Sequence, residues 1–523
     1  MSAMRVVPTG ELERERRAAR RTRFTWIAGA ALLTLALTVQ PFRDTDVWWH
    51  LALGQLITTH GIPAHEPFSF LPAAYPWVGQ QWLYEVLLAG LVGAGGAALA
   101  SAVMGAVAVV ALVVAALAVP RTARVGGVWL AIGILLSGLV MAQVVGVRGQ
   151  VISLAGVAAV LFVIARWREG RTGFVWLLPA LFLVWANMHA GFIVGLAILA
   201  LALPLARALA PATAIARKPL AAALGLSLLA TLINPAGIAL YGYVAETFMN
   251  PTITQVVTEW MSPDFHNVWV QLFEAEAILL VVLWVIGGGP DRFDAVLAVA
   301  ALAATLQAQR NISLFALIAV PQIALYGSRA WRLRIAPRLR ARRTATAPRA
   351  ASLIAVAAIT AVAAAVATTV VPRLTSSASA AFESSRYPKA AADYVAAHFA
   401  RDRLYTADSW GGYLAFRFPE GRVVFLYDET AIFGSAALQR YLDVHLLRKD
   451  WATVLSSESV HHAIVGDNSQ EAAAFHEIGW TIDCHDATSG SLVMTAPTMA
   501  PSKVSAPLTM PPPNAPGCLK ALR

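Results

Sequence analysis

The sequence predicts a mainly α-helical polytopic membrane protein with a small α/β domain near its C-terminal end. Three observations support this fold class. Of the 523 residues, 58% are hydrophobic and only 13% are charged, whereas soluble domains are typically about 25% charged. Apolar runs close to the roughly 20 residues that a bilayer crossing needs recur over the first three quarters of the chain. After about residue 373 the composition becomes polar and mixed.

Four regions follow from this change in composition. Residues 1–23 form a basic N-terminal segment. Residues 24–372 form the predicted transmembrane domain, with its first outer loop at 42–81. Residues 373–497 form the predicted extracytoplasmic α/β domain. Residues 498–523 are rich in Pro, Ala and Ser, a composition typical of a disordered tail.

About 11 crossings are expected. The stretch 82–119 is too long for one simple crossing. Its glycine-rich first half carries Glu85 and is interpreted as an interfacial or re-entrant helix, with the crossing in the second half. The other spans are expected at about 24–41, 125–145, 150–166, 173–189, 191–209, 219–237, 271–288, 291–308, 311–328 and 351–371.

The basic residues up to residue 372 fall almost entirely on one side of this topology. The predicted cytoplasmic segments hold 24 Lys and Arg residues, and the outer segments hold only Arg43, Arg148 and Arg310. Cytoplasmic loops carry an excess of Lys and Arg, so we expect a cytoplasmic N-terminus and an extracytoplasmic C-terminal domain in the plasma membrane. A full crossing at 82–95 would reverse this bias. The distribution also explains the net charge of +10 without a nucleic-acid partner.

The first outer loop carries the densest set of reactive side chains. Asp44 and Asp46 are followed by Trp48, Trp49 and His50. Paired carboxylates can hold a divalent cation such as Mg or Mn, or take a proton from a hydroxyl group. Tryptophans suit the membrane interface. The alternative interpretation is a solvated loop with an interfacial aromatic belt.

Further polar side chains are predicted at the same membrane face. Each has an ordinary explanation by itself, such as a snorkelling arginine, a core histidine or an interfacial anchor. Together they favour a site for a lipid-linked phosphate, because arginine binds phosphate through two parallel hydrogen bonds and stays charged. The set is Glu85, Arg148, Asn187, His189, Glu259 and Arg310.

The chain resembles the GT-C superfamily of integral-membrane glycosyltransferases, which carry an acidic motif in the first outer loop after span one. Asp44-Thr45-Asp46 stands at that point. The strings DTDVWWHLALGQLITTHGIPAHEPFSF, QQWLYEVL, NPAGIALYGY, VTEWMSPDF and RNISLFALIAVP are similar to a group of uncharacterised bacterial membrane proteins. That group is often placed beside the protein mannosyltransferase-like branch. The resemblance covers roughly residues 24–330.

The resemblance implies transfer of a sugar from a polyprenyl-phosphate donor, held in the membrane lipid, to an extracytoplasmic glycan, lipid or protein acceptor. Asp44 would be the base or a metal contact, with Asp46 beside it. Glu259 or Glu85 would be the second acidic residue. A divalent metal is optional in such enzymes.

The remaining outer-face residues would bind substrate in this interpretation. Arg148 or Arg310 would hold the donor phosphate. The others expected to bind substrate are Trp48, Trp49, His50, Glu85, Asn187 and His189.

Two other function classes stay open on the sequence. A transporter or flippase for a lipid-linked solute predicts internal repeats with paired broken helices, and the sequence shows no convincing repeat. A non-catalytic scaffold for envelope assembly predicts that Asp44 is dispensable.

The C-terminal region alternates strand-type and helix-type patterns. The string DSWGGY (408–413) and the pair Asp428-Glu429 are interpreted as turn and packing residues or, alternatively, as a sugar-binding surface. A disulfide between Cys484 and Cys518 is possible. Strands are expected at 403–407, 422–428 and 461–467, a hairpin at WTIDC and SLVMTAP, and helices near 388–399, 434–449 and 470–478.

Overall fold

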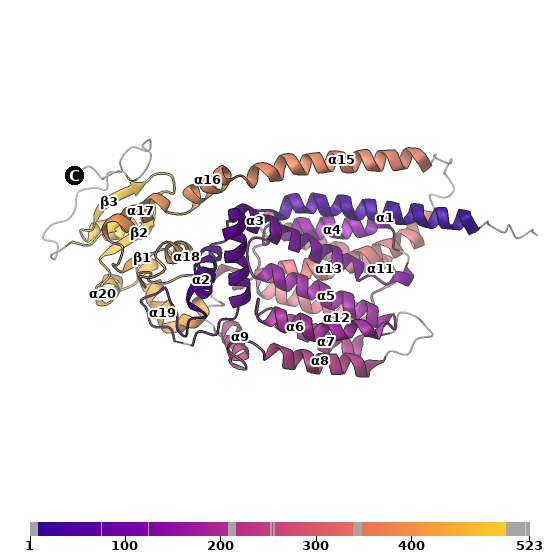
Figure 1. Cartoon of the computed structure of the whole chain (residues 1–523), viewed down its shortest axis with the longest axis horizontal. Helices are drawn as coiled ribbons and strands as arrows, with labels where there is room; N and C mark the ends of the chain where they lie inside the picture. The colour runs from indigo at the N-terminus through magenta and orange to yellow at the C-terminus, as the bar shows by residue number, and fades with distance from the viewer. Residues whose placement is uncertain are drawn as a thin grey trace, which may run out of the picture. The chain divides into compact units, whose positions relative to one another are not determined.

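The computed structural model describes residues 9–74, 76–123, 125–207, 216–250, 254, 257–337, 348–497 and 518 (Figure 1). The predicted tail at 498–523 therefore lies outside the described residues, apart from Cys518. The chain forms two compact units, each described by itself. We call Met1–Gln40, Ala102–Ile233 and Glu259–Pro372 the helical unit, and Pro41–Ser101, Asn234–Thr258 and Arg373–Arg523 the mixed unit.

The helical unit consists of apolar helices packed on one another. The helix α4 packs against α1 and α13, and α6 packs against α8. Glycines allow close approach at these interfaces, as is common between membrane helices. A Cβ on Gly133 would lie 2.8 Å from the Val320 carbonyl oxygen, and one on Gly138 would lie 2.6 Å from the Thr34 methyl carbon. The helices are α1 (Thr9–Thr38), α4 (Gly127–Met141), α5 (Gln150–Arg168), α6 (Leu178–Ala186), α7 (Phe192–Leu205), α8 (Arg217–Thr231), α11 (Val268–Ile286), α12 (Arg292–Gln307), α13 (Ile312–Ala330) and α15 (Pro348–Arg373).

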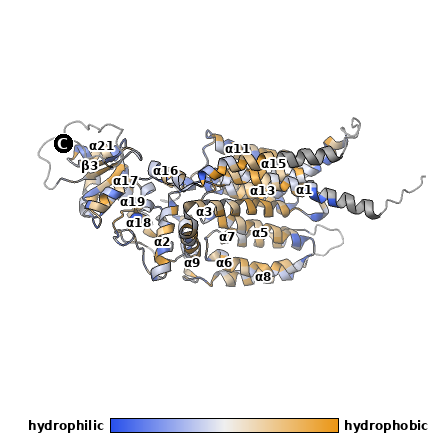
Figure 2. Ribbon diagram, turned by 45° about the horizontal axis from the view of Figure 1, so that its top comes forward, coloured by the Kyte–Doolittle hydropathy of each residue, from blue (hydrophilic) through white to orange (hydrophobic). Residues whose placement is uncertain are grey.

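Among the described residues, four helices are long and apolar enough to cross a membrane: Trp82–Leu117, Gln150–Arg168, Val268–Ile286 and Gln309–Ile335. A fifth follows if the bent pair at the end of α15 and the start of α16 is one span. Figure 2 shows hydrophobic residues along α5, α8 and α13. These features confirm a mainly α-helical membrane protein, while the number of 11 crossings stays a prediction.

The helix α3 (Trp82–Leu117) is interrupted between the two parts that the sequence predicted, an interfacial or re-entrant first half and a crossing in the second half. Gly95 has φ −154° and ψ 22°, and Gly96 has φ 66° and ψ −169°. A positive φ is easily reached only by glycine, so the Gly-Gly pair makes the break possible. The structure confirms that 82–119 is not one regular helix. A crossing by residues 82–95 stays untested.

The mixed unit combines a small sheet with short helices. The sheet has the order β1-β2-β4-β3, with β1 parallel to β2 and the other neighbours antiparallel. The predicted hairpin is confirmed as β3 and β4. The elements are α2 (Asp46–His60), α9 (Ala239–Met249), α16 (Ser376–Arg386), α17 (Lys389–His398), β1 (Leu404–Thr406), α18 (Asp408–Arg417), α19 (Thr430–His445), α20 (Trp451–Ser457), β2 (His462–Gly466), α21 (Gln470–Glu477), β3 (Thr481–Asp486) and β4 (Ser491–Thr495).

Two local predictions for this region are wrong. The run 422–428 is not a strand, because only Val424 makes ladder bridges, to Ser69 and Leu404. The string DSWGGY is not a turn but the start of α18. Its glycines serve close packing: a Cβ on Gly411 would lie 2.2 Å from the Leu426 carbonyl oxygen.

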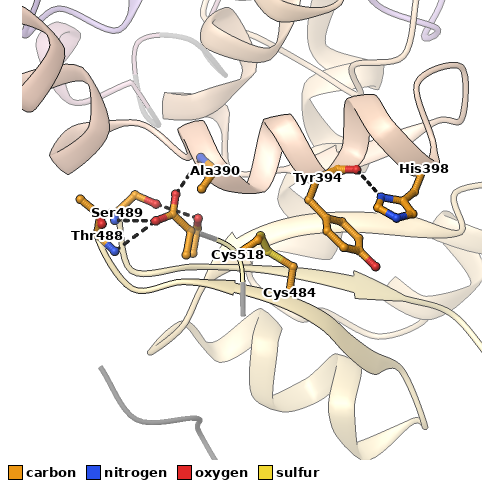
Figure 3. The surroundings of a disulfide bond; sticks show 9 residues. Ala390, Tyr394, His398, Cys484, Thr488, Ser489 and Cys518 are labelled. Carbon is orange, nitrogen blue, oxygen red and sulfur yellow. Dashed lines mark hydrogen bonds between the residues drawn. A yellow bond between two sulfur atoms is a disulfide. The ribbon is translucent and has the colours of Figure 1, made fainter. Parts of the chain in front are cut away.

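The two cysteines form a disulfide, which the sequence had allowed. Cys484 of β3 joins Cys518 beside α17 (Figure 3). In the same region the backbone amide of Ala390 donates to Asp486 at 3.0 Å. The disulfide thus ties the chain beyond the sheet back to its last hairpin.

The first outer loop packs on the C-terminal segments. The Ser69 hydroxyl donates to the Phe425 carbonyl at 2.8 Å, and the Ala74 amide donates to the Ile432 carbonyl at 2.9 Å. The Tyr387 hydroxyl donates to the Phe42 carbonyl at 3.1 Å. The loop therefore shares one packed unit with residues more than 300 positions later, an association that the linear domain prediction did not include.

Candidate functional site

The acidic motif lies at the start of α2. The Asp44 carboxylate accepts the Asp46 amide at 3.2 Å, and the Asp46 carboxylate lies 3.3 Å from the Trp49 indole nitrogen, which donates to it. Tyr387 donates to the Asp44 carbonyl at 3.1 Å. Both carboxylates are partly accessible. Asp46 is the first residue of α2, where the helix dipole is favourable for a negative charge.

The two tryptophans of the motif lie in the interior of the mixed unit. Trp48 is 6% exposed and Trp49 is 2% exposed. Trp48 makes edge contacts with Phe42, Tyr387 and Tyr413, with ring centroids 5.0–5.6 Å apart. The alternative of an interfacial aromatic belt is therefore wrong for this pair, because their rings are covered by protein.

Two further acidic residues face this motif from the segment before α19. Burial raises the pKa of Asp428 well above its ordinary range, and the charges of Asp46 and Asp408 act in the same direction. Among the described residues, Asp428 Oδ2 is enclosed and has no hydrogen-bond partner. The C-terminal segment thus places a carboxyl group beside the predicted motif, at a point where negative charges already accumulate.

Glu429 is held by two side chains from other parts of the mixed unit. The Tyr243 hydroxyl donates to Glu429 Oε1 at 2.8 Å, and the Gln80 amide donates to Oε2 at 3.2 Å. Burial raises the pKa of Glu429 to about 7, the hydrogen bond from Tyr243 opposes that rise, and the charge of Asp46 adds to it. Glu429 therefore changes its charge near neutral pH.

A second buried pair lies along α2 and α3. His50 Nδ1 is 3.1 Å from Glu85 Oε1, and both side chains are at most 4% exposed. The structure brings these two predicted substrate-binding residues together, but each is the other's partner. In the neighbouring loop, burial raises the pKa of Glu66 to about 7 against the opposing effect of the amides of Ser69 and Phe68, which donate to it.

In the helical unit the predicted arginines gather around Glu259. Arg148 Nη1 donates to Glu259 Oε1 at 2.8 Å. The Arg310 guanidinium lies 4.3 Å from the centre of the Trp260 ring, and Gln150 donates to the Arg310 carbonyl at 3.0 Å. Three short segments, the turn before α5, η3 (Thr258–Trp260) and η4 (Gln309–Asn311), supply these groups.

The charge environment of Glu259 is the opposite of that of Glu429. Partial burial acts to raise its pKa, but the charge and hydrogen bond of Arg148 and the charge of Arg310 outweigh burial, so the pKa of Glu259 lies below its ordinary value. A carboxylate of low pKa is a weak base. Glu259 is thus suited to orienting Arg148 more than to accepting a proton.

Asn187 and His189 have internal partners in the helical unit. Asn187 Nδ2 donates to the carbonyls of Leu183 and Ile233, each at 2.8 Å. His189 Nδ1 accepts the Gly191 amide at 2.9 Å and lies 2.7 Å from the Ser153 hydroxyl. These bonds fix the turn between α6 and α7. Any contact with substrate would therefore be made by atoms of Asn187 and His189 that these bonds do not engage.

Solved structures resemble most of the chain. An archaeal oligosaccharyltransferase, AglB from Archaeoglobus fulgidus in complex with an inhibitory peptide and a dolichol-phosphate, matches with a TM-score of 0.53 and 12% identity. The match covers 91% of this chain and 74% of AglB. The same archaeal enzyme tethered with an acceptor peptide gives 0.52 and 12%, covering 92% and 74%. AglB is a GT-C membrane glycosyltransferase.

The chain has the GT-C fold. ArnT from Cupriavidus metallidurans, bound to undecaprenyl phosphate, gives a TM-score of 0.49 with 14% identity over 92% of this chain and 98% of ArnT, a score too low to assign a fold. No protein-family model and no curated protein sequence matches the chain. At such low identities the likeness establishes the GT-C fold alone, so activity has to be argued from the site.

A metal ion was one option for the acidic motif of this GT-C fold. Within the part of the chain that the structure describes, no three His, Cys, Asp or Glu side chains stand close enough to hold one. Asp44 and Asp46 each have a carboxylate oxygen engaged by a protein N–H group. The described side chains thus give no set of three ligands, the optional metal at Asp44 and Asp46 stays a prediction, and we derive no step through it.

The sequence analysis identified Asp44 and Asp46 as a motif and did not connect the other half of the acidic cluster with them. Asp428 and Glu429 were interpreted as turn and packing residues or, alternatively, as part of a sugar-binding surface. Tyr243 lies within the string NPAGIALYGY, and Gln80 lies two residues before Trp82. Neither carries a signal of its own, because their role depends on contacts between segments far apart in the chain.

Proposed function

We propose that the protein is a membrane glycosyltransferase that moves a sugar from a polyprenyl-phosphate donor to an extracytoplasmic acceptor. The observation that carries the proposal is the cluster of Asp44, Asp46, Asp428 and Glu429 in a chain with the GT-C fold. Asp44 and Asp46 stand in the loop that follows the first apolar helix, and Asp428 and Glu429 belong to the C-terminal segments that pack on that loop. AglB, which shares this fold, is an oligosaccharyltransferase seen with a dolichol-phosphate.

The proposed step exchanges one bond at the sugar for another. The acceptor oxygen forms a bond to the anomeric carbon, and the bond from that carbon to the donor phosphate oxygen breaks. The acceptor proton passes to a carboxylate of the cluster, and polyprenyl phosphate leaves with the electron pair. Phosphate is a good leaving group, so no general acid is required, unlike in glycoside hydrolysis.

Asp44 and Asp46 are the carboxylates that we assign to the acceptor, because they are partly accessible. Glu429 is only 5% exposed, and the Oδ2 atom of Asp428 is enclosed. The charges of Asp44 and Asp46 favour a positive charge beside them. They would therefore stabilise the oxocarbenium-like charge that develops at the sugar as the phosphate departs.

Arg148 and Arg310 are the residues that we assign to the donor phosphate. Guanidinium groups form strong, charge-assisted hydrogen bonds with phosphate oxygens. The Glu259 carboxylate orients Arg148 through the 2.8 Å hydrogen bond. Glu259 is accordingly proposed as a positioning residue, whereas the sequence had suggested a catalytic role.

The topology completes the proposal. About 11 crossings, with the N-terminus in the cytoplasm, would place the acidic cluster on the extracytoplasmic side of the plasma membrane. The acceptor would then be an envelope glycan, lipid or protein. An optional role for Mg or Mn stays a prediction, to be checked by adding EDTA to the same assay.

The test is an assay in membranes with matched expression, following loss of labelled sugar from a panel of polyprenyl-phosphate sugars. We expect turnover by the wild type and a decrease of at least about 100-fold in Asp44→Asn or Asp46→Asn, the size of effect usual for a lost general base. The control is Glu420→Gln, an exposed carboxylate of the mixed unit. Unchanged turnover in both aspartate variants would contradict the assignment, and an absence of turnover with every donor would favour the transporter or scaffold alternatives.

A further inference from the structure

The mixed unit contains a cavity of about 350 Å³ that the acidic cluster does not use. Three groups of residues surround it. The aromatic side chains of Phe42, Trp48 and Phe382 form one group, the backbone of the Gly95–Ala98 break in α3 forms another, and residues of α16 form the third. A volume of this size is at the small end of ligand-binding pockets.

The α16 side of the cavity is polar. Ser376, Ser379 and Glu383 all line it, and their spacing of three and four residues places them on one face of the helix. Tyr413 donates to Glu383 Oε1 at 2.9 Å, and Arg417 donates to the Tyr413 hydroxyl at 3.2 Å. The carboxylate is therefore held in a fixed orientation at the cavity wall.

The aromatic side of the cavity is rigid. The Trp48 ring is surrounded by other rings, with centroids 5.0 Å away for Tyr413, 5.2 Å for Phe416, 5.3 Å for Tyr387 and 5.6 Å for Phe42. A side chain fixed by its neighbours loses little entropy when it contacts a ligand. The cavity thus has a fixed aromatic wall, in which Phe382 is the most accessible ring, opposite hydroxyl groups and a carboxylate.

The residues that line the cavity determine which class of ligand it can bind. Glu383 is the one charged side chain among the described residues that line the cavity, so an anion such as a phosphate is repelled. A purely apolar chain would cover the serine hydroxyls and the second Glu383 oxygen without bonding to them, which is unfavourable. An uncharged ring with several hydroxyl groups satisfies both sides, because its C–H faces pack on aromatic rings and its hydroxyl groups bond to Ser379 and Glu383.

The position of the cavity relates it to the acidic motif. Phe42 and Trp48 line it and stand two residues on either side of Asp44 and Asp46. We propose that this cavity binds a sugar ring of the acceptor and holds it beside the acidic motif. The identification of the bound sugar as part of the acceptor rests on the proposed function. Binding of a sugar to the cavity can nevertheless be measured without any turnover.

The experiment is saturation-transfer NMR on the purified full-length protein in lipid nanodiscs. The probes are methyl α-D-mannopyranoside, methyl β-D-glucopyranoside and methyl β-D-galactopyranoside, with methyl phosphate as the anionic comparison. Ser379→Trp fills the cavity, and Ser385→Trp adds the same ring at an exposed position of α16. Glu383→Gln keeps an oxygen for Tyr413 and removes the charge.

We expect at least one glycoside, and not methyl phosphate, to give a signal that survives in Ser385→Trp. The signal should disappear in Ser379→Trp, and the affinity should weaken about fivefold in Glu383→Gln, as when a charged hydrogen bond becomes a neutral one. If Ser379→Trp does not fold, as judged by tryptophan fluorescence, Glu383→Gln decides.

The inference is overturned if no glycoside gives a signal, or if the signal is unchanged in the cavity variants. Glycoside binding without donor turnover would refute the proposed function and leave the cavity assignment standing. Donor turnover without glycoside binding would refute the cavity assignment and leave the proposed function standing.

Discussion

The two units of the molecule treat the same chemical group in opposite ways. In the mixed unit Glu429 is buried without a cationic partner among the described residues, and its pKa rises to about 7. In the helical unit Glu259 lies beside Arg148 and Arg310, and its pKa falls below the ordinary value. The neighbouring groups, and not the residue type, therefore decide whether a carboxyl group is protonated or ionised near neutral pH.

This difference suggests a division of labour. In the proposed function, Asp44 and Asp46 suit proton transfer from the acceptor and stabilisation of a positive charge at the sugar, and the raised pKa of Asp428 and Glu429 suits these two groups to holding a proton. A set of arginines ordered by an ionised glutamate suits a phosphate group. Each of the following predictions either disrupts one of the two units or measures the difference between their carboxyl groups.

The largest effect is expected from Gly411→Ala, which disrupts the packing of α18 within the mixed unit. The added Cβ would lie 2.2 Å from the Leu426 carbonyl oxygen, a backbone atom that cannot move aside cheaply. We expect a loss of about 3 kcal/mol or more, the upper range for overpacking, measured as a lower thermal midpoint of tryptophan fluorescence. Gly93→Ala is the control, since nothing lies within 4 Å of its added Cβ. Equal midpoints for the two variants would show that α18 does not pack as described.

A smaller effect concerns the pH dependence of stability. The pKa of Glu429 is about 7 in the folded protein and 4.5 ordinarily, so the folded state holds the proton more tightly. The resulting stabilisation is fully present below about pH 4.5 and is lost as the pH rises through about 7, up to about 3 kcal/mol. Glu66 changes in the same way.

We therefore expect the thermal midpoint of the wild type to fall between pH 5 and pH 8, and Glu429→Gln to remove about half of that fall. Glu420→Gln should retain it. A midpoint that rises over this range, or one whose fall is unaffected by Glu429→Gln, would show that Glu429 is not buried beside Asp46.

The smallest effect is expected from Glu259→Gln, which tests the helical unit. As a positioning residue, Glu259 should change the donor KM by about three- to tenfold, because a charge-assisted bond to Arg148 becomes a neutral one, and should leave the turnover rate at saturating donor nearly unchanged. The donor titration of this variant distinguishes the two roles. If that saturated rate drops by about 100-fold or more while the KM stays unaltered, Glu259 is the base and the division of labour is reversed.

The helical unit was the part that the sequence predicted well. Hydropathy and charge act locally along the chain, so the spans near 150–166 and 271–288 correspond to α5 and α11. The division of 82–119 into two parts was also foreseen, because a full crossing by its glycine-rich first half would place the later basic residues on the outer side. Arg148 and Glu259 were predicted at one membrane face, and the structure places them in contact.

The acidic cluster could be predicted only in part. Asp44 and Asp46 stood out because they follow the first span directly. Asp428 and Glu429 lie over 380 residues later, and no local pattern indicates that the outer loop packs on their segment. Strand-like residues at 422–428 also misled the prediction, since that segment is held by bonds to the outer loop and β1 and not by a regular ladder.

The most direct test of the division of labour measures turnover and lipid-phosphate binding in the same two variants. Asp46→Asn should slow turnover at saturating donor by at least about 100-fold and leave the affinity for a polyprenyl phosphate unchanged. Arg148→Ala should weaken that affinity by about 10- to 100-fold, the loss expected for one charge-assisted contact. If Asp46→Asn weakens lipid-phosphate binding as much as Arg148→Ala does, or if neither variant affects either quantity, the account is contradicted.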